Sequence, residues 1–209
     1  MRFAELLEAV GSFPLFETGT LLDGRWDAAD VRRQLSRWVA DGRVQQLRRS
    51  LYALAAPYRR AEPDPFYIAN QLILGSYVSL QAALSHHGLI PEAVFTVTSV
   101  THRRARDFDT PLGRFSYRNV KRELFGGYEA LERRGQTCYL ATPEKALADL
   151  IHLTPGGDDR AYLEELRLNL SRLRWRALAA WAASSDRVRR ALPHLRALRR
   201  AEAGFEVLP

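Results

Sequence analysis

The stretch DAADVRRQLSRWVADGRVQQLRRSLYAL, residues 27–54, decides the fold of the first third of the chain. Its apolar residues Val31, Leu35, Trp38 and Val39 fall at i, i+4, i+7 and i+8. That spacing predicts an amphipathic helix with one buried stripe, in which Trp38 belongs to the core. Asp27 is expected to cap the start of this helix, and Gly42 to follow its last turn.

Residues 44–48 and 51–55 then predict two short strands joined by a turn at Arg49-Ser50. Upstream, residues 3–10 predict a short amphipathic helix stopped by Gly11, and residues 17–24 a second, very short helix. Three helices followed by a hairpin is the order of a winged helix-turn-helix. In that fold the third helix enters the major groove and the hairpin, or wing, reaches neighbouring phosphates.

The third helix carries polar residues opposite its apolar stripe, and the wing carries two arginines at its tip. Arginine pairs well with phosphate and guanine, and hydroxyl groups near a helix start can donate to phosphate. Taken singly, a charged helix face is more typical of a solvated surface than of a binding site, and so is an arginine pair in a turn; the order of the features along the chain favours DNA binding. The predicted DNA-binding residues are Thr18, Thr20, Arg32, Arg33, Gln34, Ser36, Arg37, Arg48 and Arg49.

The charge of the whole chain agrees with a polyanionic partner. It has 31 basic and 24 acidic residues, a formal charge of +7 and a pI near 10. Charge alone leaves nucleic acid, a membrane surface and an acidic protein open. Only Lys121 and Lys145 are lysines, a bias that suits phosphate but also follows from GC-rich codon usage. The single cysteine, Cys138, excludes an internal disulfide and is expected to be buried and inert.

The rest of the chain predicts a second, mixed domain. Proline-rich residues 57–64 read as a linker, which divides the chain into a winged domain at 1–56 and a C-terminal domain at 65–209. We expect helices over 66–74 and 79–87, strand structure over 93–104 and 113–125, a strand at 136–141, a helix over 143–153 capped by Thr142, and further helices to the end. The expected fold class is therefore α+β. No apolar run is long enough to span a bilayer, and no signal peptide is recognised, so a cytoplasmic protein without a membrane partner is expected.

Several ordered segments give the chain a family resemblance. They are LRRSLYAL (47–54), SLQAAL (79–84), HGLIPE (87–92), TSVT (98–101), GRFSYR (113–118) and PEKALADL (143–150). Together they resemble the AbiEi antitoxins of type IV toxin–antitoxin pairs, over about residues 3 to 175. The resemblance implies an N-terminal domain that represses its own operon at inverted repeats in double-stranded DNA, and a C-terminal domain that opposes a nucleotidyltransferase-like toxin. Ser50 departs from the family, where glycine is more usual at this turn.

Catalytic patterns are weak. Neither lysine follows glycine as a phosphate-binding loop requires, and the acids of Asp107-Phe108-Asp109 are expected in a polar loop. The histidines lack metal-ligand spacing, and a Ser-His-Asp site using Ser79 or Ser85 with His86 stays open. We expect no enzyme, cofactor or metal. The alternative is a stand-alone winged-helix transcription factor with a ligand-sensing second domain.

The C-terminal end is dense in arginine and is one candidate for contact with the toxin or with DNA backbone. A solvated helix face explains the same pattern. The residues are Arg187, Arg189, Arg190, Arg196, Arg199 and Arg200.

Overall fold

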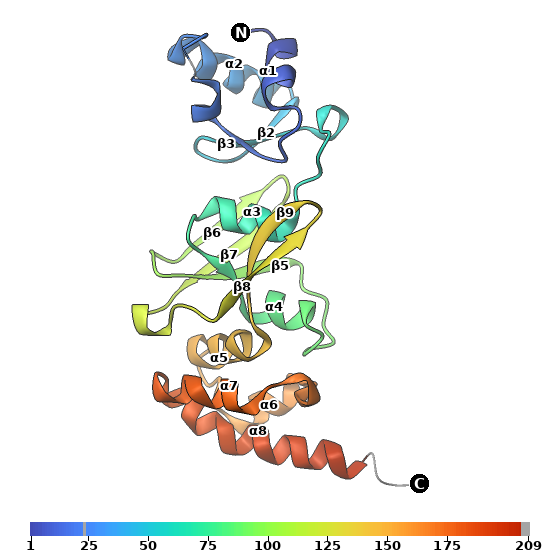
Figure 1. Cartoon of the computed structure of the whole chain (residues 1–209), viewed down its shortest axis with the longest axis vertical. Helices are drawn as coiled ribbons and strands as arrows, with labels where there is room; N and C mark the ends of the chain where they lie inside the picture. The colour runs from blue at the N-terminus through green and yellow to red at the C-terminus, as the bar shows by residue number, and fades with distance from the viewer. Residues whose placement is uncertain (23, 206–209) are drawn as a thin grey trace.

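The computed structural model describes residues 1–22 and 24–205. Figure 1 shows an elongated molecule, with a small unit at the N-terminus, a β-sheet in the middle and a layer of helices at the C-terminus. The α-helices are α1 (Phe3–Val10), α2 (Ala28–Ala40), α3 (Pro65–Leu72), α4 (Leu80–His86), α5 (Pro143–Leu153), α6 (Arg160–Glu165), α7 (Trp175–Ala180) and α8 (Asp186–Phe205). The strands are β1 (Phe16–Glu17), β2 (Val44–Arg48), β3 (Leu51–Leu54), β4 (Tyr77–Val78), β5 (Thr96–Thr101), β6 (Arg106–Thr110), β7 (Gly113–Asn119), β8 (Tyr128–Arg133) and β9 (Gln136–Ala141). Short 3-10 helices are η1 (Thr18–Leu21), η2 (Ala56–Tyr58), η3 (Arg122–Leu124), η4 (Leu170–Arg172) and η5 (Trp181–Ala183).

In the first unit, α1 and α2 cover a three-stranded antiparallel sheet ordered β1-β3-β2. The predicted stripe of α2 is buried in its core, and Trp38 lies there rather than on the surface. The second helix expected at 17–24 is wrong in form. Phe16 and Glu17 instead pair with β3, and the Thr-Gly-Thr sequence that follows forms only the 3-10 turn η1, because threonine and glycine are poor helix formers.

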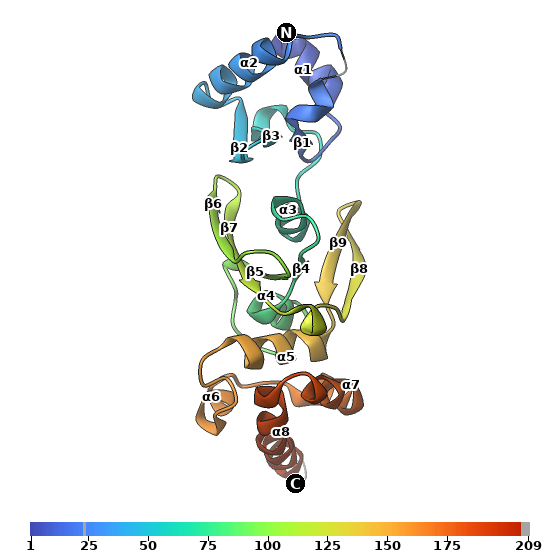
Figure 2. The same ribbon diagram turned by 90° about the vertical axis from the view of Figure 1, so that its left-hand side faces the viewer.

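The second unit is built on a mixed six-stranded sheet ordered β6-β7-β5-β4-β9-β8. The β5–β7 and β4–β9 pairs are parallel and the other pairs are antiparallel. In Figure 2 the sheet curves around α3, with β6 and β7 on one side and β8 and β9 on the other. Asn70 of α3 fixes this arrangement, because its side chain accepts a hydrogen bond from the Tyr139 amide at 2.7 Å and donates to the Ser76 carbonyl at 3.1 Å.

Two expectations about the strands need correction. Asp107 and Asp109 are not in a loop: they belong to β6, which pairs with β7 along its whole length. Their side chains alternate with that of Phe108, as in a strand with one covered face. An alternation of only three residues was too short to predict a strand from the sequence. The strands expected at 93–104 and 113–125 are both shorter: Phe95, which is 92% exposed, lies before the first residue of β5, and β7 ends at Asn119 ahead of η3.

The helical layer below the sheet begins with α5, and this helix follows the prediction. Thr142 caps it by accepting a hydrogen bond from the Lys145 amide at 3.3 Å, and Pro143 occupies its first turn. Its face toward the sheet and its face toward α7 and α8 are both buried, so α5 is a central element of the core. Cys138 of β9 is buried as expected, and burial raises the pKa of its thiol to about 12.

The two units touch along the wing side of the small sheet. Leu15, Leu47 and Leu51 are buried in the same apolar cluster as the second unit, while the rest of the first unit has a cluster of its own. Strand β2 runs against β6, and Arg48 reaches α3. Within the described chain, no helix is both long enough and apolar enough to cross a membrane.

Candidate nucleic-acid interface

Helix α2 is held at its start by two aspartates. The side chain of Asp27 accepts hydrogen bonds from the amides of Ala29 and Asp30, at 2.9 and 3.0 Å, as the sequence predicted. The carboxylate of Asp30 accepts from the N-terminal ammonium of Met1 at 2.9 Å and from Arg33 Nη2 at 2.7 Å. These two cations lower the pKa of Asp30, the ammonium having the larger effect. The chain terminus is thus fixed beside the first turn of α2.

The outer face of α2 is polar and open to solvent. Arg32, Arg33, Ser36 and Arg37 are exposed, and Gln34 is half-buried at the edge of the core. Within the part of the chain that the structure describes, Arg32 and Arg37 have no hydrogen-bond or ion-pair partner, while Arg33 has the exposed Asp30. The structure therefore brings Arg32, Arg33, Ser36 and Arg37 onto one accessible helix face, with Gln34 outside it at the edge of the core.

The two arginines at the β2–β3 turn, which the sequence predicted to be a wing, differ in their surroundings. Arg49 is exposed at the tip of the hairpin. Arg48 is only 23% exposed: its Nη2 donates to Glu17 Oε1 at 2.9 Å and to the Gln71 carbonyl at 3.2 Å. Its Nε is buried without a partner among the described residues. Arg48 thus faces the seam between the units rather than open solvent. Sequence reasoning missed this because a strand pattern does not say what packs against the strand.

The two threonines predicted to contact DNA differ in exposure. Thr20 is exposed on η1, but Thr18 is buried, and its amide donates to the Ser50 carbonyl at 3.0 Å. Thr18 therefore anchors β1 and η1 to the wing turn and is not on the surface that α2 presents. Ser50 itself adopts φ of 67°, a left-handed conformation that favours glycine.

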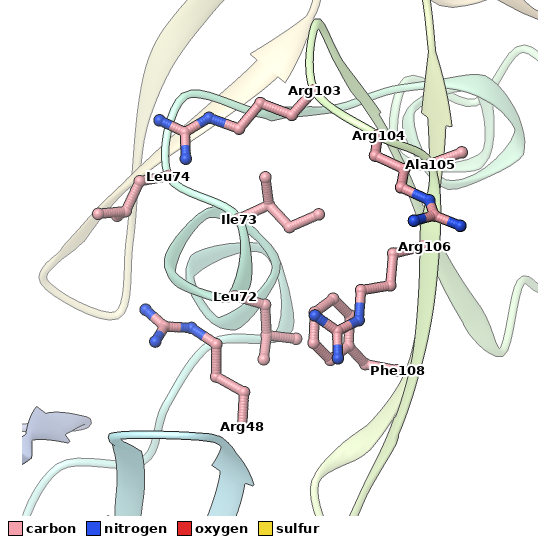
Figure 3. Close-up of a pocket in the computed structure, with 9 residues that line it drawn as sticks. All are labelled: Arg48, Leu72, Ile73, Leu74, Arg103, Arg104, Ala105, Arg106 and Phe108. Atoms are coloured by element: carbon pink, nitrogen blue, oxygen red, sulfur yellow. The ribbon is translucent and has the colours of Figure 1, made fainter.

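Beside the seam lies a cavity of about 660 Å³. It opens between β2 of the first unit, the end of α3 and the residues that join β5 to β6. Figure 3 shows its four arginine side chains around Leu72 and Ile73. The lining residues are Arg48, Leu72, Ile73, Leu74, Arg103, Arg104, Ala105, Arg106 and Phe108.

A buried polar cluster in the second unit was not predicted. Lys145 Nζ lies 2.6 Å from Asp149 Oδ1, and Asp149 Oδ2 accepts from Ser79 Oγ at 2.7 Å and Tyr77 OH at 3.1 Å. Burial raises the pKa of Asp149, and the ammonium and the two hydroxyls oppose that effect. Ser79, Lys145 and Asp149 are almost fully buried, so no substrate can reach them. The signal available was a lysine four residues before an aspartate on an otherwise apolar helix.

The two serines considered for a Ser-His-Asp site have other partners. Ser79 points to Asp149, while Ser85 Oγ donates to the Glu92 carbonyl at 3.0 Å, so neither serine pairs with His86. His86 instead has Arg133 Nη1 at 3.3 Å from its Nδ1. Among the described residues, no three His, Cys, Asp or Glu side chains are grouped as a metal site would need.

The arginine-dense end is partly used inside the fold. Arg187 donates to the carbonyls of His152 and Thr154, Arg189 contacts Asp186, and Arg190 Nε lies 2.6 Å from Asp158. Arg196, Arg199 and Arg200 lie around a shallow hollow beside Trp175. Arg187 and Arg190 therefore hold α8 against its neighbours, whereas Arg189 pairs with Asp186 within α8 itself.

Comparison of the sequence with known proteins does not assign the chain to a family. A scan of protein-family models and a search of curated proteins both found no match to this chain.

Proposed function

We propose that this protein is a DNA-binding regulator in which the first unit is a winged helix-turn-helix and α2 is the recognition helix. One observation carries the proposal: the outer face of α2 presents Arg32, Arg33 and Arg37 together, opposite a buried apolar stripe. An α-helix of this length fits the major groove, where arginine binds guanine edges and phosphates. Arg49 on the adjacent turn supplies the phosphate contact of the wing.

The state of these arginines supports the proposal energetically. Arg32 and Arg37 have no carboxylate partner among the described residues, so DNA binding would break no ion pair at either side chain. Arg33 would exchange Asp30 for a phosphate, and an exposed ion pair of this kind contributes little to stability because solvent screens it. Asp30 keeps the Met1 ammonium as a partner after that exchange. The face can therefore bind a polyanion with little internal cost.

The test is binding of a fluorescent duplex that carries the DNA upstream of this protein's own gene. Arg33→Ala and Arg37→Ala should each weaken binding, whereas Arg160→Ala should not, because Arg160 lies on α6 and pairs with Glu164. Both α2 variants should leave toxin neutralisation intact. If both bind the duplex as well as the parent does, α2 is not the recognition helix.

We further propose that the protein represses its own operon at inverted repeats and is the antitoxin of a nucleotidyltransferase-like toxin. The support is the ordered series of segments that resembles the AbiEi antitoxins. Expression of the neighbouring gene with and without this protein tests the pairing: growth should stop without it and recover with it. Co-purification of the two proteins would then separate direct binding from the removal of a toxic product.

The alternative is a stand-alone winged-helix transcription factor whose second unit senses a ligand. The arginine-lined cavity at the seam favours it, because a ligand there would touch both units. An adjacent gene whose product is harmless when expressed alone would support this alternative over the antitoxin.

We also propose that the function is non-enzymatic and that the protein works in the cytoplasm. The most polar buried cluster, around Asp149, is closed to substrates. Incubation with plasmid and Mg²⁺ should give no nicked product; nicking that co-purifies with the protein would overturn this part.

A further inference from the structure

The cavity at the seam combines positive charge with an apolar floor. Arg103, Arg104 and Arg106 come from one short segment at the start of β6, and Arg48 comes from the wing. Leu72, Ile73 and Phe108 lie between them (Figure 3). Its volume of about 660 Å³ is far larger than a phosphate ion needs and falls in the range of sites for small organic ligands.

The arginine segment has a fixed backbone and available side chains. The Arg103 amide donates to Thr101 Oγ1 at 3.1 Å, and its carbonyl accepts from Asn119 Nδ2 at 2.7 Å. In the described parts of the chain, Arg103 and Arg104 have no ion pair. The guanidinium of Arg106 stacks on the ring of Phe108, 4.8 Å from its centroid. A rigid backbone that presents unpaired guanidinium groups is organised in advance for an anion.

The nearby carboxylates do not neutralise the cavity. Asp107 accepts a hydrogen bond from Ser116 Oγ at 2.7 Å, and Asp109 lies 3.7 Å from Arg114, so both face β7. Glu17 contacts only Arg48, whose buried Nε is still unpartnered. An anion in the cavity would thus meet several arginines and little acidic competition.

We propose that this cavity binds a small phosphate-bearing molecule with a planar ring, of the nucleotide class. Arginine forks bind phosphate oxygens in pairs, and Arg103, Arg104 and Arg106, which Figure 3 shows at different sides of the cavity, supply the positive charge that attracts the phosphates. The ring packs on Leu72 and Ile73, beside the Arg106 guanidinium that lies over the Phe108 ring. Because Arg48 also contacts Glu17 and Gln71, the bound molecule bridges the wing and the second unit. The proposal is independent of DNA binding by α2.

The experiment is calorimetric titration of the full chain in EDTA with ATP, pyrophosphate and adenosine. ATP should bind, pyrophosphate should bind more weakly, and adenosine should bind at least about tenfold more weakly than ATP, since it lacks the phosphates. Arg103→Gln and Arg106→Gln should each weaken ATP binding about tenfold, the effect of one charge-assisted contact. Arg114→Gln, an exposed β7 arginine outside the cavity, is the matched control and should bind as the parent does.

The outcomes are separable. All of the substituted arginines are exposed, so the thermal midpoint of each variant should match the parent and report intact folding. Absence of ATP and pyrophosphate binding, or unchanged binding in the Arg103 and Arg106 variants, overturns the proposal. So does loss of duplex DNA binding in those variants without any ATP binding, because the segment would then be a DNA backbone contact. Arg37→Ala should keep full ATP affinity, whatever its effect on DNA.

Discussion

Lys145 Nζ lies 2.6 Å from Asp149 Oδ1 in the core of the second unit, and neither side chain is more than 2% exposed. The ammonium also donates to the Leu124 carbonyl and lies 4.1 Å from the centroid of the Trp181 ring. Through Tyr77 and Ser79, the carboxylate holds β4 and the start of α4. One ion pair therefore links the sheet to the helices at the C-terminal end.

Lys145→Met and Asp149→Asn should each lower the free energy of unfolding by about 3–5 kcal/mol, because each leaves the partner charge buried and unpaired. Urea denaturation followed by circular dichroism measures the change. The double variant Lys145→Met/Asp149→Leu removes both charges and should be less destabilised than the sum of the single ones. A loss below about 1 kcal/mol in both single variants would show that the pair is dispensable.

The ion pair of Lys145 and Asp149 shows that a segment can be noticed in the sequence while its role is misjudged. Ser79, Lys145 and Asp149 all lie in segments that carry the family resemblance, SLQAAL and PEKALADL. In the structure they hold the core together rather than forming a reactive site. Local patterns predicted α2, the hairpin and α5, because each depends on apolar spacing and caps that neighbouring residues specify.

What the sequence could not predict depends on distant contacts. The orientation of Arg48 is set by Glu17 and by Gln71 of α3, 31 and 23 residues away in the chain. Strands β6 and β8 are edge strands of the curved sheet, with weak alternation and many polar residues, so no local signal marked them. The cavity joins residues 48, 72–74, 103–106 and 108, which only the folded chain brings together.

The wing turn provides a test of backbone strain. Ser50 has φ of 67°, so Ser50→Gly should raise the free energy of unfolding by up to about 1 kcal/mol, as relief of left-handed strain exceeds the entropy of glycine. Gly42 has nearly the same backbone angle, φ of 69°, and provides the reverse substitution as a control. Gly42→Ala should lower the free energy of unfolding by about 1 kcal/mol. A Cβ at Gly42 would meet no described atom within 4 Å, so the loss would come from the backbone alone. Equal stability of parent and Ser50→Gly would contradict the assigned turn.

Glu144 should make stability depend on pH in acid. Burial raises the pKa of Glu144, but hydrogen bonds from the Arg174 guanidinium and amide outweigh it, so the pKa is lowered. A carboxyl with a lowered folded pKa stabilises the protein above its unfolded pKa, about 4.3, and this contribution is lost as the pH falls through the folded value. The difference in urea midpoint between parent and Glu144→Gln should be largest near pH 6 and shrink below about pH 4. A difference that stays constant from pH 6 to pH 3 would assign the effect to packing.

For the DNA binding that we propose, the salt dependence of the affinity would separate base contacts from phosphate contacts on the first unit. Each phosphate that an arginine neutralises adds about 0.9 to the slope of log affinity against log salt concentration. Arg49, exposed on the wing turn, is placed for a phosphate, so Arg49→Ala should weaken binding to all duplexes and reduce the slope by about 1. Arg37 lies in the middle of the α2 face, so Arg37→Ala should also lower the preference for the proposed operator over a scrambled duplex. Arg48→Gln should leave the slope unchanged, because Glu17 and Gln71 already hold that side chain at the seam. A loss of slope in Arg48→Gln equal to that in Arg49→Ala would mean that Arg48 leaves its partners when DNA binds.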